Sequence, residues 1–371
     1  MKGGKLIKAL FTVALSAIVF SLLIFLLIKL APVPPVDDIK SAIASLSDAS
    51  SRQASTYARK LYNEAEAAYD SAMANWKREN KKFIYFRNYE KTVAYARLAE
   101  KKAREASNSS VKNSNDLNSR LKTKINALKN RSSDIERIFG RYPLENADRS
   151  RLSKGNILLK EAEIAFEKKQ LLSANRKLND AGDLLDLVFD NAMSDIKAYF
   201  GSYPAWKKWF ESSVAESRNH KNYLILVDKY AHKCYLYLSG IKKYEFDAEL
   251  GKNWVGDKKI MGDKVTPEGL YKVTGKHQGA ETQYYKSLGI NYPNNDDVER
   301  FRKEIASGSL PRSAKIGSGI EIHGGGGKGV DWTDGCVALE NKDMDILFRL
   351  VPPGTPVIIV GSLKSLDDIT R

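Results

Sequence analysis

A histidine and a cysteine enclose a segment of this sequence whose residue types suit covalent chemistry. The segment, HGGGGKGVDWTDGC, runs from His323 to Cys336. A thiol becomes a strong nucleophile only as its thiolate, and a neighbouring histidine, with an ordinary pKa of about 6.5, can accept the thiol proton and later give it to a leaving group. We therefore predict that Cys336 is a nucleophile and that His323 is its base.

The loop between these two residues predicts how a substrate would be held. Glycine at position 335 lets a substrate carbonyl approach the backbone closely. The N–H groups of Gly335 and Cys336 are then candidates for stabilising an oxyanion. The GGGGKG run lacks the spacing of a phosphate-binding loop, and we predict no cofactor.

The remaining histidines and the second cysteine favour structural roles. His220, His232 and His277 have no metal-ligand spacing to another histidine or cysteine, so we predict no metal site. Cys234 lies in an alternating, strand-like run, which is typical of a small buried side chain. A disulfide between Cys234 and Cys336 is the alternative in an oxidising compartment, and it would abolish the thiol chemistry.

Short apolar runs that end in turn residues predict a β-rich domain around the loop. Residues 224–227 and 234–238 predict two strands joined by a turn, and a third strand is expected around 244–249. Three later stretches, GLYKVTG, GIEIHG and PVIIVG, predict further strands. Residues 341–351 predict one helix capped by Asn341. We expect a mixed-sheet, β-sandwich-like domain with this helix packed on it.

These blocks resemble the L,D-transpeptidase catalytic domain of the YkuD type. The family signature is a histidine followed by glycine and then a Ser/Thr-x-Gly-Cys segment, and this chain has IHGGG followed by DWTDGCVAL. GDKVTPEGLYKV, at 262–273, is similar to the family's Gly-Asp-x-x-Thr-Pro-x-Gly stretch, and YYKSLGINYPNNDD, at 284–297, is similar to the Tyr-Pro-Asn element of one branch. The resemblance covers residues 221–361, with the blocks in the expected order.

What the resemblance implies is an enzyme of peptidoglycan. Cys336 would attack the carbonyl on the L-centre of the stem peptide's diamino acid, expel the terminal D-alanine and leave a thioester. His323 would act as base and then as acid. An amine, from a second stem peptide or another donor, would resolve the thioester, whereas water would make the enzyme a hydrolase.

Other positions of the motif receive softer roles from the resemblance. Thr333 would orient the histidine or the loop through its hydroxyl, and the loop or oxyanion set is Gly324, Thr333, Asp334 and Gly335. The groove wall would include Thr266, Tyr285 and Tyr292. Many members carry an arginine two residues after the cysteine, and this chain has Ala338 there. Transfer and hydrolysis therefore both remain open.

The N-terminus predicts a membrane anchor. Residues 9–28 contain no charge and, at the rise of an α-helix, span about 30 Å, the thickness of a bilayer core. Lysines precede this run and aspartates follow it, which places the N-terminus in the cytoplasm and the rest of the chain outside by the positive-inside rule. A cleaved signal peptide is the alternative.

A long stretch after the anchor predicts helices. LYNEAEAAY at 61–69 and LLKEAEIAF at 158–166 echo one another, which predicts two α-hairpins. SNSSVKNSNDLN at 107–118 predicts a connecting loop. The aromatic residues Phe83, Tyr85 and Phe86 are interpreted as core or inter-helix packing, with a ligand-binding face as the alternative.

The expected organisation is an α+β multidomain chain in four parts. Residues 1–31 form a cytoplasmic basic tip and signal anchor, 32–205 a helical, coiled-coil-like domain with the two α-hairpins, 206–362 the L,D-transpeptidase-type domain, and 363–371 a tail. The chain would then be a single-pass protein of the bacterial cytoplasmic membrane, with its catalytic domain on the outer side.

The formal charge of +15 suits acidic partners. Nucleic acid is not expected, because no nucleic-acid-binding motif accompanies the charge and export argues against it. The expected partners are peptidoglycan stem peptides, the membrane through the N-terminal helix, and envelope proteins through the helical domain. A catalytically degenerate envelope scaffold is the second hypothesis.

Overall fold

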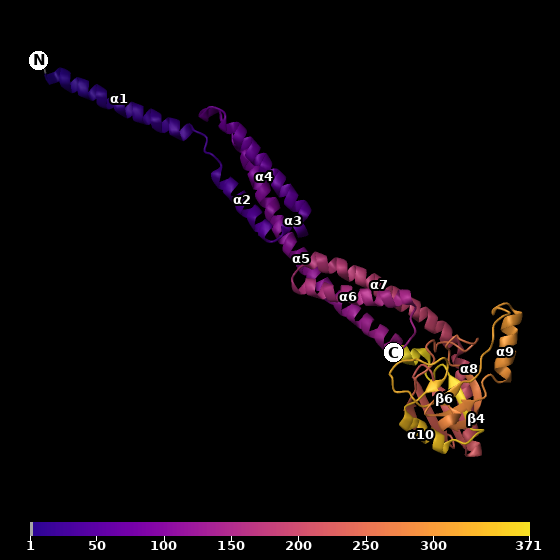
Figure 1. The fold of residues 1–371 in the computed structure, drawn as a ribbon. Helices are drawn as coiled ribbons and strands as arrows, with labels where there is room; N and C mark the ends of the chain where they lie inside the picture. The colour runs from indigo at the N-terminus through magenta and orange to yellow at the C-terminus, as the bar shows by residue number, and fades with distance from the viewer. Residues whose placement is uncertain (1–2) are drawn as a thin grey trace. The chain divides into compact units, whose positions relative to one another are not determined.

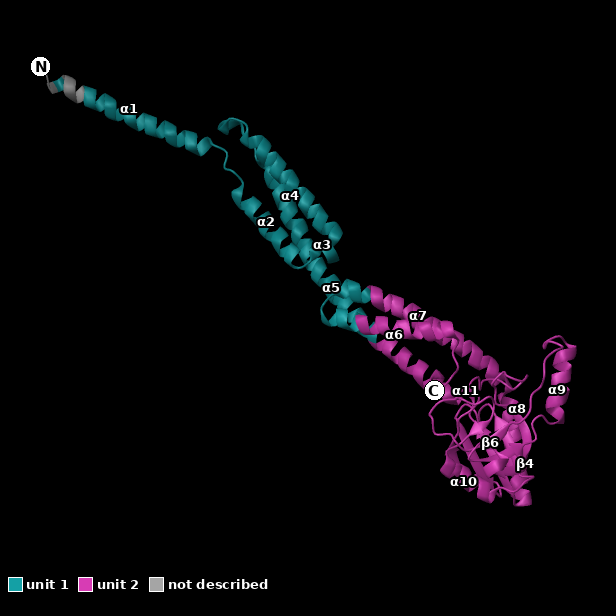
Figure 2. Ribbon diagram, viewed as in Figure 1, with its two compact units in different colours: residues 1–125, 162–175 teal, residues 126–161, 176–371 magenta. Residues whose placement is uncertain are grey.

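The structure, a computed structural model, describes residues 3–371 and combines N-terminal helices with a C-terminal mixed sheet (Figure 1). Unit 1 holds the residues up to Ile125 together with Ala162–Asn175, and unit 2 holds Asn126–Glu161 together with Arg176–Arg371 (Figure 2). Three helices contribute residues to both units: α5 (Glu90–Phe139), α6 (Asn146–Glu167) and α7 (Leu171–Tyr199). The predicted α+β class is confirmed.

Unit 1 starts with the apolar helix α1 (Gly3–Leu30). Its stretch Ala9–Leu30 is long and apolar enough to cross a membrane and is not buried within the protein. After it come α2 (Val36–Ser51), the short α3 (Ala54–Tyr57), α4 (Arg59–Asn80) and the first part of α5. Buried alanines line these helices at helical spacing, which lets the backbones pack closely.

The predicted loop at 107–118 is wrong, because these residues are helical and lie within α5. Their serines, which favour turns in isolation, bind a neighbouring helix here. The Ser107 hydroxyl donates to Asp48 Oδ2 at 2.6 Å, and the Ser110 hydroxyl donates to the Arg52 carbonyl at 2.5 Å. Tertiary hydrogen bonds thus keep a loop-like composition helical.

The predicted packing of Phe83, Tyr85 and Phe86 between helices is also wrong. These residues lie in the turn between α4 and α5, which contains the 3₁₀ helix η1 (Ile84–Phe86), and all three side chains are exposed. Phe83 is 67% exposed and Phe86 is 75% exposed. These two rings therefore contribute little to the core of unit 1.

Unit 2 is built on an eight-stranded mixed sheet with the order β3-β2-β1-β8-β4-β5-β6-β7. Pairs β1–β8 and β6–β7 are parallel, and the other neighbours are antiparallel. The strands are β1 (Tyr223–Asp228), β2 (Lys233–Leu238), β3 (Ile241–Asp247), β4 (Gly269–Gln278), β5 (Lys286–Ile290), β6 (Glu321–His323), β7 (Val337–Ala338) and β8 (Pro356–Val360). All six predicted strand stretches are confirmed.

The sheet curls until its two ends meet. Glu249, just beyond edge strand β3, forms an antiparallel bridge with Ala338 of the opposite edge strand β7. The Glu249 N–H donates to the Ala338 carbonyl at 2.9 Å, and the Ala338 N–H donates to the Glu249 carbonyl at 2.8 Å. This bridge removes the free edge of the short strand β7 and fixes the residues around Cys336 from both sides.

Three helices accompany the sheet within the C-terminal region: α9 (Asn295–Ala306), α10 (Asn341–Leu350) and α11 (Leu366–Thr370). Helix α10 confirms the predicted amphipathic helix, but the predicted cap is wrong. The N-cap is Glu340, and the Asn341 Oδ1 instead accepts the Gly325 N–H at 2.8 Å. The asparagine therefore holds the glycine-rich loop rather than the helix end.

Helical residues of unit 2 are joined to the sheet region by buried polar groups. Helix α8 (Tyr203–His220) supplies Trp206, whose indole N–H donates to Glu268 Oε2 at 2.8 Å. The Tyr199 hydroxyl and the fully buried Lys229 ammonium both bind Glu268 Oε1, at 2.7 and 2.8 Å. Hydrogen bonds from these three donors offset the cost of burying the Glu268 carboxylate. Through them, Glu268 connects the helices to the segment that follows the GDKVTP stretch.

Candidate active site

The parallel pair β6–β7 places His323 and Cys336 on one face of the sheet. Ile322 lies opposite Val337, and His323 lies opposite Ala338. Because side chains alternate along a strand, Ile322 and Val337 enter the core while His323 and the residue before Val337 point to the other face. Cys336 therefore lies one residue before β7 and two residues from Ala338, the residue opposite His323.

The Cys336 side chain is buried, and its sulfur lies among backbone polar groups. It accepts the Glu321 N–H at 3.4 Å and lies 3.7 Å from the Gly319 carbonyl oxygen, to which the thiol can donate. Burial is the largest effect and raises the pKa of the Cys336 thiol, whereas hydrogen bonds from the Glu321 N–H and from Tyr284 lower it. The resting sulfur is therefore a thiol rather than a thiolate.

The imidazole of His323 is oriented to act as a proton acceptor. Its Nδ1 lies 2.8 Å from the Gly324 carbonyl oxygen, so Nδ1 carries the hydrogen and Nε2 carries the lone pair. Nε2 is buried and has no hydrogen-bond partner among the described residues. Burial lowers the pKa of His323, and Lys328 lowers it further. The ring is thus neutral near pH 7 with one free basic nitrogen.

Two aromatic side chains enclose this ring. Tyr284 stacks on His323 with centroids 3.6 Å apart and planes 8° apart. Trp332 approaches edge-on, at 5.8 Å and 74°, and the Lys328 ammonium lies 3.2 Å from the Trp332 ring centre. The packing limits the ring to one orientation and excludes water from one side.

Thr333 orders the turn before the cysteine. Its hydroxyl donates to the Cys336 carbonyl at 2.7 Å and accepts the Gly335 N–H at 3.2 Å. Gly335 has φ +129°, and a Cβ there would lie 2.7 Å from the Val265 carbonyl oxygen, so the position requires glycine. Asp334 between them is exposed. The threonine hydroxyl therefore serves the loop rather than the histidine.

The two predicted oxyanion donors differ in availability. The Gly335 N–H already donates to Thr333. The Cys336 N–H donates to no acceptor among the residues that the structure describes. The cysteine's own amide is thus the better placed of the two for a developing oxyanion.

Two carboxylates fix the glycine-rich loop. Glu249 Oε1 accepts the Gly329 N–H at 2.6 Å, and Glu249 Oε2 accepts the Trp332 indole N–H at 2.7 Å. Asp331 Oδ1 accepts the Leu250 N–H at 2.7 Å, while its Oδ2 lies 2.8 Å from His232 Nε2. The loop is therefore a shaped segment held at several points.

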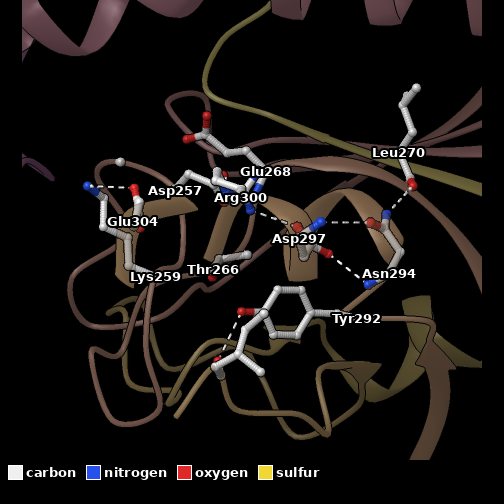
Figure 3. Close-up of polar contacts among 12 residues, drawn as sticks. Asp257, Lys259, Thr266, Glu268, Leu270, Tyr292, Asn294, Asp297, Arg300 and Glu304 are labelled. Atoms are coloured by element: carbon white, nitrogen blue, oxygen red, sulfur yellow. Dashed lines mark hydrogen bonds and ion pairs between the residues drawn. The ribbon is translucent and has the colours of Figure 1, made fainter. Parts of the chain in front are cut away.

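The softer candidates for the groove wall lie in different environments. Thr266 is fully buried, and its hydroxyl accepts the Gly251 N–H at 2.9 Å. Tyr292 is also buried and donates to the Ile316 carbonyl at 3.2 Å; Figure 3 shows it and Thr266 beside the polar network that includes Asp297 and Arg300. Tyr285 is 46% exposed, and substrate contact therefore stays a prediction mainly for this residue.

Several residues of the site were not predicted. Tyr284, Trp332 and Glu249 contact the reactive pair or its loop, yet none belongs to the histidine–cysteine signature. Trp332 lies within the quoted motif and Tyr284 begins the second quoted block, so both were visible in the sequence. Glu249 had no signal, because only the curling of the sheet brings it to β7.

Comparison with known proteins supports the resemblance. Residues 222–359 match the family model of the L,D-transpeptidase catalytic domain, YkuD. The chain is 33% identical over 109 residues to "Putative L,D-transpeptidase YqjB" of Bacillus subtilis (strain 168), an alignment that covers 29% of this chain and 58% of that protein.

Solved structures also align with the C-terminal part. An L,D-transpeptidase from Mycobacterium smegmatis aligns at 14% identity and a TM-score of 0.26, over 38% of this chain and 58% of that one. An Enterococcus faecium L,D-transpeptidase aligns at 18% identity and a TM-score of 0.26, over 38% of this chain and 50% of that one. The C-terminal part of this chain, residues 222–359, is thus similar to the L,D-transpeptidase catalytic domain of the YkuD family.

Proposed function

We propose that this protein is a cysteine-dependent acyltransferase that acts on the stem tetrapeptides of peptidoglycan. The single observation that supports this most is the pairing of β6 with β7, which places His323 of β6 and Cys336, the residue before β7, on one face of the sheet, with Tyr284 stacked on the imidazole. The family match favours acyl transfer as the reaction of the His323–Cys336 pair.

The first half-reaction forms a thioester. The Cys336 thiol gives its proton to Nε2 of His323, and the sulfur attacks the carbonyl on the L-centre of the diamino acid. The Cys336 N–H stabilises the oxyanion. The C–N bond to the terminal D-alanine then breaks, and His323 returns the proton to the leaving amine. Because the resting pair is neutral, the proton moves during attack rather than before substrate binds.

The second half-reaction depends on the acceptor. An incoming amine attacks the thioester carbonyl and gives a proton to His323. The C–S bond breaks, His323 returns the proton to the Cys336 sulfur, and the new amide cross-links or remodels the wall. Water in its place gives hydrolysis of the stem peptide. Ala338 lies opposite His323 with no exposed surface, so it supplies no charge to recognise an acceptor carboxylate. Both outcomes follow from the same thioester.

The N-terminal helix gives the proposed location. The stretch Ala9–Leu30 acts as a single-pass signal anchor, with the N-terminus in the cytoplasm and the catalytic domain outside, facing its substrate. Residues 32–205 then form the helical domain, 206–362 the catalytic domain and 363–371 the tail. The helical domain is the proposed surface for envelope protein partners.

Product analysis tests the proposed reaction. The full-length chain in lipid nanodiscs is incubated with tetrapeptide-bearing muropeptides, and products are identified by mass spectrometry. Released D-alanine with a new amide supports transfer, and released D-alanine with a tripeptide supports hydrolysis. Cys336→Ala should abolish both, whereas Cys234→Ala should not, because burial raises the pKa of the Cys234 thiol to about 12 and keeps it unreactive.

The scaffold hypothesis makes the opposite prediction. A degenerate site would release no D-alanine and would not be acylated by a carbapenem-type β-lactam, which often labels active members of the family. Full activity in Cys336→Ala would contradict the proposed enzyme outright.

A further inference from the structure

A cluster of apolar side chains projects from unit 1 at the turn between α4 and α5. The cluster, here called the aromatic tip, comprises Phe83, Ile84, Tyr85 and Phe86, which are 67%, 40%, 38% and 75% exposed. The Phe83 ring lies 5.8 Å from that of Tyr85 and 6.1 Å from that of Phe86, so the three rings form one cluster, and Ile84 lies between two of them in sequence. Contiguous exposed apolar surface of this kind marks an interaction site.

The turn beneath the aromatic tip is built from specific polar contacts. Arg87 Nε donates to the Lys82 carbonyl at 3.0 Å, and an Arg87 terminal nitrogen donates to the Asn80 carbonyl at 3.2 Å. The buried carboxylate of Glu79 accepts the Asn88 N–H at 3.0 Å. The Tyr89 hydroxyl donates to Asn80 Oδ1 at 2.6 Å. These bonds hold the polar groups inside the turn and the apolar groups outside.

The aromatic tip lies at the end of unit 1 where the chain leaves α1. Pro32 and Val33, which follow α1, line one surface hollow together with Arg87 and its neighbours. Figure 1 shows the α4–α5 turn and the start of α2 at the same end of these helices. Val33 is three residues past Leu30, so at most about 11 Å of chain separates it from the end of the apolar helix.

The packing of α2 extends this placement. Ile39, near the start of α2, packs against Ala72 of α4 and Ala96 of α5. Arg97 also donates to Asp38 at 2.8 Å. Helix α4 continues for eight residues from Ala72 to Asn80. The α4–α5 turn therefore lies about 12 Å beyond the level of Ile39, on the side where the chain connects to α1.

We propose that the aromatic tip inserts into the headgroup and outer acyl layer of the bilayer that α1 spans. This inference rests on the proposed anchor. Aromatic side chains favour the membrane interface, and the exposed Lys81 beside the tip suits lipid phosphates. The protein is then attached at two points, the spanning helix and the tip, and helices α2 to α4 are held at a defined orientation to the membrane surface rather than swinging freely about residues 31–35.

Spin-label accessibility tests the tip and the anchor separately. Both native cysteines are replaced by alanine in the full chain, and single labels are introduced through Phe86→Cys at the tip, Phe20→Cys in α1, and Asn115→Cys on the exposed side of α5 as the control. Position 115 lies about 38 Å along α5 from Glu90. Each protein is reconstituted in nanodiscs, and collisions with lipid-soluble oxygen and with a water-soluble nickel chelate are compared. Circular dichroism confirms that each variant is folded.

The tip label should resemble the α1 label, with high access to oxygen and a loss of access to the chelate, while the control label shows the reverse. A tip label as accessible to the chelate as the control, with the α1 label still in lipid, would overturn the tip insertion and leave the anchor intact. A tip label shielded from both reagents would also overturn it, because the tip would then be covered by protein. An α1 label open to the chelate would overturn the anchor itself, and the tip proposal with it.

Discussion

The ring of Tyr284 lies parallel to the imidazole of His323, with centroids 3.6 Å and planes 8° apart, and hydrogen bonding from the same tyrosine lowers the pKa of Cys336 against the larger effect of burial. One side chain thus contacts both reactive groups. It holds the base by its face and stabilises the sulfur anion through its hydroxyl.

Separating these two contacts gives the first prediction. Tyr284→Phe keeps the stacked ring but removes the hydrogen bond that lowers the pKa of Cys336, so the rate of D-alanine release should fall about tenfold. Tyr284→Ala also frees the imidazole and should lose more. Initial rates for the two variants measure the difference. Equal activity of Tyr284→Phe and the parent would show that the hydroxyl has no part in the reaction.

The second prediction concerns pH. Burial lowers the pKa of His323 below its ordinary 6.5, so the base stays neutral as the pH falls through 6.5, and kcat/KM should decline only at more acidic pH. Burial raises the pKa of Cys336 above its ordinary 9.0, so an alkaline rise should come above that value. Rates of D-alanine release, measured in a series of acidic and alkaline buffers, give both the acidic decline and the alkaline rise of the pH–rate profile. An acid limb centred above 6.5 would contradict the buried, neutral base.

The third prediction tests the anchoring of the loop by Glu249. Glu249→Ala leaves the Trp332 indole N–H and the Gly329 N–H without their acceptor, which should cost about 1–3 kcal/mol of unfolding free energy and lower activity by loosening the wall beside His323. Thermal unfolding and D-alanine release measure the two effects. Glu340→Ala is the matched control, because Glu340 pairs with the exposed Lys342 and its loss should change little. Equal effects of the two changes would refute the anchoring role.

A pair of glycines supplies the fourth prediction. Gly335→Ala combines φ +129° with a Cβ 2.7 Å from the Val265 carbonyl, so it should destabilise the fold by about 1–3 kcal/mol and inactivate the site. Gly329→Ala has φ +74° but open space around its Cβ, and should cost only about 1 kcal/mol. Denaturant unfolding gives the loss of unfolding free energy for both variants. The difference between them separates the effect of the Cβ contact at position 335 from that of the positive φ. A Gly335→Ala variant as stable and active as Gly329→Ala would contradict the close approach seen at the turn.

Local pattern predicted the parts of the fold that local physics determines. The alternating run around Cys234 and the apolar run at 224–227 became β2 and β1, and the face of Met344 and Leu347 became that of α10. The histidine–cysteine loop was also readable, because glycine spacing and residue type are properties of the sequence itself.

The remaining parts depend on contacts between distant residues. Tyr284 and Tyr285 are neighbours in sequence, and nothing in the pair itself tells which one stacks on His323. Glu249 reaches the loop because the sheet curls, and the helical serines at 107 and 110 bond to Asp48 of α2 and to Arg52, the residue after α2. The composition of residues 107–118 alone favoured a loop rather than the helix that the structure has.

The central claim is that Cys336 carries the acyl group, and peptide mass spectrometry of the acylated protein tests it most directly. The full-length chain is mixed with a tetrapeptide muropeptide, quenched in acid and digested, and the peptide that contains Cys336 is sequenced. We predict a mass gain equal to the muropeptide minus D-alanine, localised to Cys336 and lost on treatment with hydroxylamine. D-alanine release with an unmodified Cys336, or an adduct on another residue, would contradict the account.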